Sequence, residues 1–323
     1  MPRNSDVTRN RRPRPGIAVA VLGLAGGLLT VLGGCSPGPG TDLAAPAGPS
    51  ASAGHAAWPD AIPRTGLTKG MVLPLEAYME TYPESVAIER AVQRLETQCM
   101  ARYGFTYRPT PPGAFPPPNN DDSNMARRYG IADPAHAAKY GYTIGDENDV
   151  PDSGPRLSTA EISVLTGRVA LRPNAAKAPS TYRGKSIPAD GCQGESVTRV
   201  GAAVDTGLPG RLDYESLTKS QADPRVQKVI GAWSDCMKSK GYTVDSPLNA
   251  ADLAPHSSGE AGSAEITVAT ADVNCKQKTD LVKVWFSVES AIQRRQVEQN
   301  HLALQDVRDR ITAAVKASAA VTG

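Results

Sequence analysis

Two segments of the chain carry apolar residues at the alternating spacing of three and four that is typical of an amphipathic helix. The first follows Thr81 and Glu84, which form a capping-box sequence, and the second follows Asp223 and Pro224, a helix-start pair. We therefore expect a helix in each segment. The apolar faces are Ile88, Val92, Leu95 and Cys99 in the first segment, and Val226, Val229, Ile230, Trp233 and Met237 in the second.

Both segments end in the same short sequence. Cysteine, methionine, three variable residues, glycine, an aromatic residue and threonine occur in this order at 99–106 and again, 137 residues later, at 236–243. Gly104 and Gly241 stand where a helix ends in a left-handed conformation, and the residues after them are expected to be extended. The repetition predicts a protein built from two helical pseudo-repeats.

The C-terminal part has the most regular pattern. Residues 264–314 contain neither proline nor glycine, and two apolar stripes are separated by polar residues at 294–301. This predicts one helix of about 50 residues or a helical hairpin broken near Asn300. We expect the stripes to pack onto the same domain. They consist of Leu281, Val284, Trp285, Val288, Ala291 and Ile292, and of Leu304, Val307, Ile311 and Ala314.

Between the two duplicated segments we expect short helices joined by long loops. Ser158 and Glu161 form another capping box, and Asp133-Pro134 separates two short helical stretches. Residues 108–124 are rich in proline and asparagine, which favours a stiff surface loop. The predicted fold class is therefore mainly α, with short extended segments and long loops.

The N-terminus has the pattern of an export signal. Five arginines precede an uncharged run at 17–34, which ends in Leu32-Gly33-Gly34-Cys35. This resembles a bacterial lipobox, so residues 1–34 are predicted to be a signal peptide and Cys35 the lipidated first residue. A single membrane-spanning helix is the alternative, but the run contains five glycines. The pair Arg11-Arg12 leaves twin-arginine export open beside the general route.

Composition divides the remaining chain. Residues 35–66 are mostly Pro, Gly, Ala and Ser, and we expect a flexible tether that spans on the order of 30 Å. The first pseudo-repeat is assigned to 67–208 and the second to 209–323. Two acyl chains on Cys35 would anchor the protein stably at the outer face of the cytoplasmic membrane.

Four further cysteines are expected to form two disulfides, because an even number outside the cytoplasm favours pairing. Four cysteines allow three pairings, and the duplication favours the one within each half. This solution joins Cys99 to Cys192 and Cys236 to Cys275.

The lipobox and the paired Cys-Met segments lead to a resemblance. Together with Tyr182-Arg183-Gly184-Lys185 before Gly191-Cys192, and with Trp285 in the last helix, they resemble a family of uncharacterised lipoproteins from actinomycetes, the high-GC Gram-positive bacteria. The resemblance covers essentially the whole mature chain. It implies an extracytoplasmic location and no particular catalytic residue.

Charge argues against an anionic partner for the chain as a whole. The 35 Lys and Arg residues exceed the 33 Asp and Glu residues by two. Removing residues 1–34 takes away five arginines and one aspartate, so the mature chain has a net charge of −2. This gives no reason to expect a patch for nucleic acid or for anionic lipid.

No motif for catalysis or cofactor binding stands out. Gly184-Lys185-Ser186 lacks the earlier glycine of a phosphate-binding loop, and the four histidines have no metal-ligand spacing. Acidic residues crowd at 146–152, but without the spacing of a calcium-binding loop. We expect no cofactor and no enzymatic activity.

Three functions remain open. The first is a non-enzymatic envelope lipoprotein that binds an envelope protein or a cell-wall partner. The second is a solute-binding module with a cleft between the halves, and the third is a cell-wall hydrolase that uses carboxylates distant in sequence. Aromatic residues next to glycine are the candidate walls of such a cleft, namely Tyr103, Tyr129, Tyr140 and Tyr242.

Overall fold

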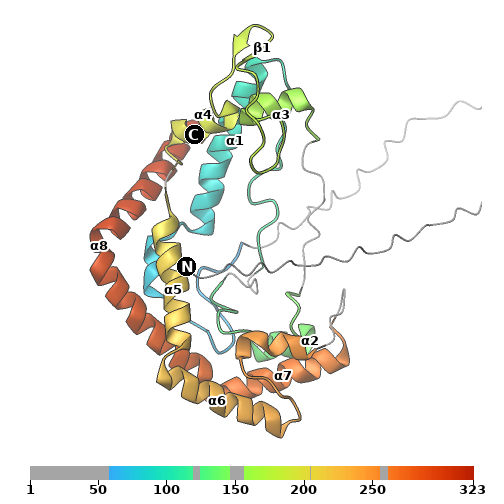
Figure 1. The fold of residues 1–323 in the computed structure, drawn as a ribbon, viewed down its shortest axis with the longest axis vertical. Helices are drawn as coiled ribbons and strands as arrows, with labels where there is room; N and C mark the ends of the chain where they lie inside the picture. The colour runs from blue at the N-terminus through green and yellow to red at the C-terminus, as the bar shows by residue number, and fades with distance from the viewer. Residues whose placement is uncertain (1–57, 119–123, 146–155, 204, 255–260) are drawn as a thin grey trace, which may run out of the picture. The chain divides into compact units, whose positions relative to one another are not determined.

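The computed structural model describes residues 58–118, 124–145, 156–203, 205–254 and 261–323, and most of these residues are helical (Figure 1). This confirms the prediction of a mainly α-helical protein. The predicted signal peptide and Cys35 lie outside the described residues. The elements are η1 (Pro74–Tyr78), α1 (Tyr82–Arg102), α2 (Pro134–Tyr140), α3 (Thr159–Thr166), β1 (Thr181–Tyr182), β2 (Lys185–Ser186), α4 (Gly191–Val200), α5 (Gly207–Gln221), α6 (Pro224–Ser239), η2 (Pro247–Leu253), α7 (Ser263–Lys278) and α8 (Leu281–Thr322).

Three helices begin where the sequence predicts a start. At α1 the N–H of Thr81 donates to Oε2 of Glu84 at 2.9 Å, and at α3 the N–H of Ser158 donates to Oε2 of Glu161 at 2.8 Å. At α6 the carboxylate of Asp223 accepts a backbone N–H of the first turn at 2.9 Å. Each start satisfies backbone donors that have no partner within the helix.

The duplicated sequence forms a duplicated helix end. Gly104 after α1 has a φ of +85°, and Gly241 after α6 has a φ of +90°. The N–H of the aromatic residue that follows donates to the carbonyl of the repeated methionine, at 3.2 Å after α1 and 3.1 Å after α6. A side chain at either glycine would disfavour this turn, which closes the helix with a left-handed residue.

Two disulfides join helices that are distant in sequence. Cys99 at the end of α1 pairs with Cys192 in α4, and Cys236 in α6 pairs with Cys275 in α7, with Cα–Cα distances of 5.6 and 5.7 Å. This is the within-half pairing that the duplication favours.

The paired strands do not lie where extended segments are expected. The residues after Gly104 and Gly241 form no strand, whereas Thr181–Tyr182 and Lys185–Ser186 pair antiparallel. The two residues between these strands both have positive φ, 48° and 77°. That backbone is the one a two-residue hairpin requires.

The C-terminal region contains one helix break that the sequence does not predict, before α8, and an interruption at Asn300. α7 ends at Lys278, and Asp280 has a left-handed φ of 52° before α8 begins. α8 then continues through Asn300, whose φ of −118° and ψ of 17° are not helical. There the side-chain amide of Asn300 donates to the carbonyl of Gln296 at 2.8 Å. Two helical segments of α8 therefore meet at a kink at Asn300, where the sequence places a possible break, and a side chain bonded to the preceding turn is a common cause of such a kink.

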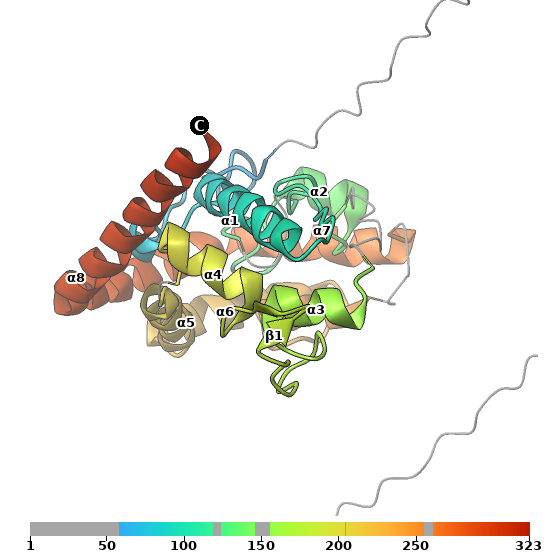
Figure 2. The same cartoon turned by 90° about the horizontal axis from the view of Figure 1, so that it is seen from above.

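Buried apolar side chains form three clusters. The largest joins α6, α7 and the first half of α8 to α2 and to residues 125–132. Its centre includes Tyr129 and Trp285, whose ring centroids are 5.1 Å apart. Residues 125–142, assigned by sequence to the first pseudo-repeat, thus pack with the helices of the second. The other clusters lie between α1, α3 and α4 and between α1, α4 and the end of α8 (Figure 2).

Residues 58–66, which the sequence assigns to the tether, contact the helical part of the chain. The ring of Trp58 lies edge-on to Tyr82 at the start of α1, with centroids 5.6 Å apart. Gly66 approaches residue 132 so closely that an added Cβ would lie 2.8 Å from a carbonyl oxygen. These contacts place residues 60–68 along one wall of a pocket.

Candidate functional site

A pocket of about 320 Å³ lies where residues 60–68, η1, residues 124–133 and α5 meet. Its volume is at the lower end of the range of about 300–1,000 Å³ that is typical of small-molecule sites. The charged side chains that line it are Asp60, Arg64, Glu76, Arg128, Asp133 and Asp213.

Arg128 connects the pocket to the interior. Its Nη2 and Nη1 donate to the two carboxylate oxygens of Asp213 at 2.9 Å each, and its Nε donates to Glu289 at 3.1 Å. Burial disfavours the guanidinium charge, but the bonds and charges of these two carboxylates outweigh it and raise the pKa of Arg128. The side chain is therefore a fixed cation that is already neutralised by two anions.

The wall behind Arg128 is a buried hydrogen-bond network. Glu289 in α8 is fully buried and accepts from the hydroxyls of Tyr129 at 2.8 Å and Ser216 at 2.9 Å. The amide of Gln293 donates to Ser216 and Asp213 at 2.9 Å, and its oxygen accepts the N–H of Leu75 in η1 at 3.0 Å. Because every link uses a buried partner, we expect the network to hold α5, α8 and η1 in fixed positions.

Glu76 lines the pocket and forms no ion pair with any described residue. One of its oxygens accepts the N–H of Leu73 at 3.0 Å. Burial raises the pKa of Glu76, against the effects of this hydrogen bond and of the Arg128 charge, and repulsion from Asp213 adds to the rise. A positive charge brought next to Glu76 would favour its ionised form.

The opposite wall presents a hydroxyl and a second carboxylate. Thr68 is only 1 % exposed and lines this wall. Asp133 caps α2 by accepting the N–H groups of Ala135 and His136 at 2.8 and 3.1 Å. Although burial opposes its charge, these bonds and one from Thr65 lower the pKa of Asp133.

The pocket has a negative balance of charge. Four carboxylates line it against two guanidinium groups, and Arg64 is paired with Asp60 at 2.7 Å. With Arg128 held by two acids, the described lining residues include no further cation to balance Glu76 and Asp133. Such a pocket favours a cationic or neutral polar solute over an anion.

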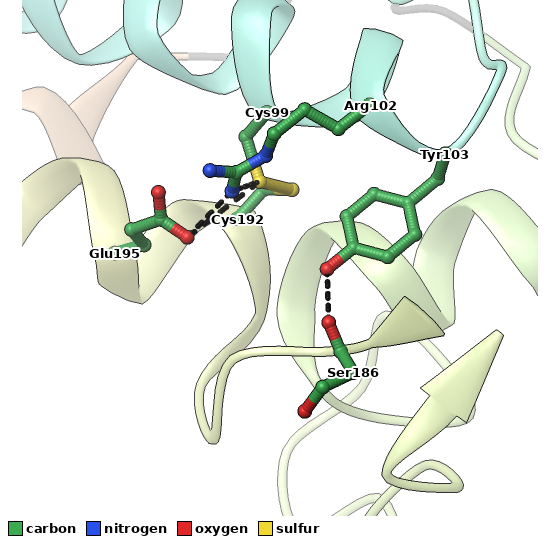
Figure 3. Close-up of a disulfide and its surroundings, with 6 residues drawn as sticks. All are labelled: Cys99, Arg102, Tyr103, Ser186, Cys192 and Glu195. Atoms are coloured by element: carbon green, nitrogen blue, oxygen red, sulfur yellow. Dashed lines mark hydrogen bonds and ion pairs between the residues drawn. A yellow bond between two sulfur atoms is a disulfide. The ribbon is translucent and has the colours of Figure 1, made fainter. Parts of the chain in front are cut away.

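A second group of polar side chains surrounds the disulfide between α1 and α4 (Figure 3). Nη2 of Arg102 lies 2.9 Å from Sγ of Cys99 and 2.6 Å from a carboxylate oxygen of Glu195. The hydrogen bond to Glu195 raises the pKa of Arg102. In the duplicated segment of α6 the equivalent residue is Ser239, which donates to its own helix at 2.7 Å. The contact that Arg102 makes with the first disulfide is therefore not repeated by Ser239 at the second.

The four tyrosines proposed as ligand walls do not meet. Tyr103 is buried beside the first disulfide and donates to the carbonyl of Ser186, and Tyr129 is buried in the largest core (Figure 3). Tyr242 packs against that same core, whereas the ring of Tyr140 lies 5.1 Å from that of His136. Among the described residues none of the four lines the pocket around Glu76, but Tyr103 lines a separate pocket together with Lys185 and Glu195.

No pattern in the sequence pointed to the residues around the pocket. Glu76, Asp213 and Glu289 lie in η1, α5 and α8, Arg128 lies in the segment before α2, and no spacing motif links them. The acidic residues at 146–152 lie outside the described residues. Within the described ranges, no group of His, Cys, Asp and Glu is arranged to hold a metal ion, and no helix is long and apolar enough to cross a membrane. Comparison of the chain with family models, with curated proteins and with solved structures finds no match.

Proposed function

We propose that this protein is a non-enzymatic binding protein of the cell envelope, whose pocket around Glu76 binds a small, positively charged polar solute. Acyl chains on Cys35 would hold it at the outer face of the cytoplasmic membrane. The lipobox sequence and the resemblance to actinomycete lipoproteins support the location.

The observation that carries the proposed ligand is the pocket's unbalanced negative charge. Glu76 and Asp133 face a volume large enough for a solute, and Arg128, the more buried of the two cations in the described lining, is bound to two other acids. An ammonium group at Glu76 would form a charge-assisted hydrogen bond in a half-buried setting, where such bonds are strong. Thr68 offers a further hydroxyl to the same ligand.

Titration calorimetry with three four-carbon probes tests this ligand class on the full chain in detergent. The probes are 1,4-diaminobutane, 1,4-butanediol and succinate, which have similar lengths but are cationic, neutral and anionic. We expect the diamine to bind most tightly. Equal or tighter binding of either other probe, or no binding of any probe, would reject the proposal.

Substitution of one carboxylate separates the pocket from general charge effects. Glu76→Gln is expected to weaken diamine binding by at least about tenfold, the loss of one charge-assisted hydrogen bond. Glu80→Gln removes the same charge from an exposed residue four positions later and should leave affinity unchanged.

The raised pKa of Glu76 adds a pH test. The cation binds the ionised carboxylate, so diamine affinity should rise as the pH rises through this pKa. Binding should also release protons, measured as a dependence of the binding enthalpy on the buffer. The Glu76→Gln variant should lose this proton release, and its persistence would assign the effect to another group.

The anchor is tested separately from the pocket. Cys35→Ala should release the protein from the membrane fraction of intact cells. Unchanged retention would contradict lipid anchoring and leave the solute proposal standing.

A further inference from the structure

A continuous stretch of the chain is strongly basic. Between Glu161 and Asp190 there are 28 residues without an acid, and five of them are basic. The net charge of the whole chain does not reveal this basic stretch, because acidic residues elsewhere balance it. The five residues are Arg168, Arg172, Lys177, Arg183 and Lys185.

The stretch folds into two consecutive hairpins. In the first, the N–H of Val169 donates to the carbonyl of Ala176 at 3.0 Å, and residues 168 and 177 form an antiparallel bridge. The second is the β1–β2 hairpin. Figures 1 and 2 show these loops beside β1 and α3. We call residues 167–186 the basic hairpins.

The charges of the basic hairpins are available to a partner. All five side chains belong to exposed residues, and none forms an ion pair with any residue in the described ranges. Arg168 donates to the carbonyl of Ala175 at 3.1 Å, Lys185 to that of Arg102, and Arg183 lies 5.3 Å from the ring centre of Tyr182. These contacts leave the positive charges unneutralised.

An apolar side chain stands among these cations. Leu171 is 65 % exposed and lies next to Arg172 at the end of the first hairpin. Leucine beside arginine suits the boundary of a lipid bilayer, where the cation meets phosphate and the apolar group leaves water. A soluble polyanion would use the five cations but give Leu171 no apolar environment.

We propose that the basic hairpins are a docking surface for an anionic phospholipid membrane. Their five cations bind headgroup phosphates, and Leu171 enters the boundary between headgroups and acyl chains. The surface acts independently of the pocket, and the proposed anchor on Cys35 would keep it near such a membrane.

Hydrogen exchange of the full chain in the presence of vesicles tests the surface directly. Vesicles of phosphatidylcholine alone are compared with vesicles that also contain phosphatidylglycerol. We expect exchange at residues 167–186 to slow by at least about tenfold with the anionic vesicles only, since each cation near such a surface strengthens binding by roughly fivefold. Salt at about 1 M should abolish the effect, because charges are then screened within about 3 Å.

Three sets of substitutions assign the effect to the hairpin charges. Arg168→Gln/Arg172→Gln/Lys177→Gln should lose the protection. Arg168→Lys/Arg172→Lys keeps the charge but removes the guanidinium contact with Ala175, and this variant should still be protected from exchange. The matched control is Lys228→Gln/Lys238→Gln/Lys240→Gln, which removes three exposed cations from α6 and its end. Its residues 167–186 should still be protected from exchange.

Several outcomes would overturn the proposal. Equal protection by neutral vesicles would exclude a role for lipid charge, and loss in the lysine variant would mean that hairpin structure and not charge is responsible. Protection by soluble polyphosphate but not by anionic vesicles would identify an anionic polymer as the partner. The readout is local, so failure of the Cys35 anchor would not imitate any of these results.

Discussion

The pair formed by Lys276 and Asp272 in α7 provides the sharpest test of the core. Both side chains are fully buried, and Nζ of Lys276 donates to Oδ2 of Asp272 at 3.0 Å. Nζ also donates to the carbonyl of Ile131 at 2.9 Å, and Asp272 accepts from the indole of Trp233 at 2.9 Å. Burial opposes both charges, so it raises the pKa of Asp272 and lowers that of Lys276.

Lys276→Met removes the cation but keeps a side chain of similar length. The carboxylate of Asp272 then stays buried with neutral donors only, and the carbonyl of Ile131 loses its partner. Breaking a buried pair in this way costs about 3–5 kcal/mol. We expect a loss of about 4 kcal/mol in the free energy of unfolding near pH 7, seen as a fall of more than about 1 M in the urea midpoint.

The loss should depend on pH. The charge of Lys276 lowers the pKa of Asp272, so without it the effect of burial is less opposed and the pKa rises further. The folded variant then holds a proton that the unfolded chain releases near pH 4. The stability of the variant therefore falls as the pH rises above about 4, by up to about 1.4 kcal/mol per pH unit. Lys276→Met/Asp272→Asn should abolish this slope, because the amide does not ionise and its oxygen can still accept from Trp233.

Urea unfolding with both disulfides intact, followed at several pH values, measures these effects. Lys278→Met is the matched control, because Lys278 is exposed on the same helix and its loss should change stability by less than about 0.5 kcal/mol. The reasoning fails if Lys276→Met costs less than about 1 kcal/mol. It also fails if the cost is the same at every pH.

Two other stability predictions follow from burial and from loop length. Burial, with repulsion from Glu89, raises the pKa of Glu96 to about 7, so folding stability should fall as the pH rises from about 4.5 to 7. Glu96→Gln should remove this slope in urea midpoints, and an unchanged slope would assign it elsewhere. The Cys99–Cys192 disulfide closes 93 residues and Cys236–Cys275 closes 39, so replacing the first pair by alanines should cost about 0.8 kcal/mol more than replacing the second. Calorimetric melting of both variants measures the difference, and a larger cost for the second pair would contradict the loop-entropy account.

The sequence predicted those parts of the fold that short-range chemistry determines. Thr81 and Glu84 lie within one turn of each other, and the N–H groups of Gly104 and Gly241 bond carbonyls only three positions back. The break at Asp280 was missed because neither glycine nor proline marks it. A left-handed aspartate there is stabilised by the packing of α7 and α8, which no local pattern reports.

The pocket was not predictable by the same means. Glu76 and Glu289 are more than two hundred residues apart, and only the packing of η1 against α8 brings both toward Arg128. Placing the ligand walls at tyrosines next to glycine did not point to the pocket around Glu76, because Tyr103, Tyr129 and Tyr242 pack in or against the apolar cores. Net charge counted in windows of about 20 residues would have revealed the basic hairpins, because their five basic residues lie close together in the sequence.

The two proposed binding surfaces have opposite charge for a physical reason. Around the pocket, acids outnumber bases, and Arg128 is held by buried carboxylates that stabilise the fold. The basic hairpins contain no acid, so their cations form no internal pairs and contribute little to folding; their mutual repulsion slightly opposes it. Folding stability therefore explains the charges around Arg128 but not those of the hairpins. An external anion accounts for the hairpin charges, and this is the strongest reason to test the hairpins against a membrane.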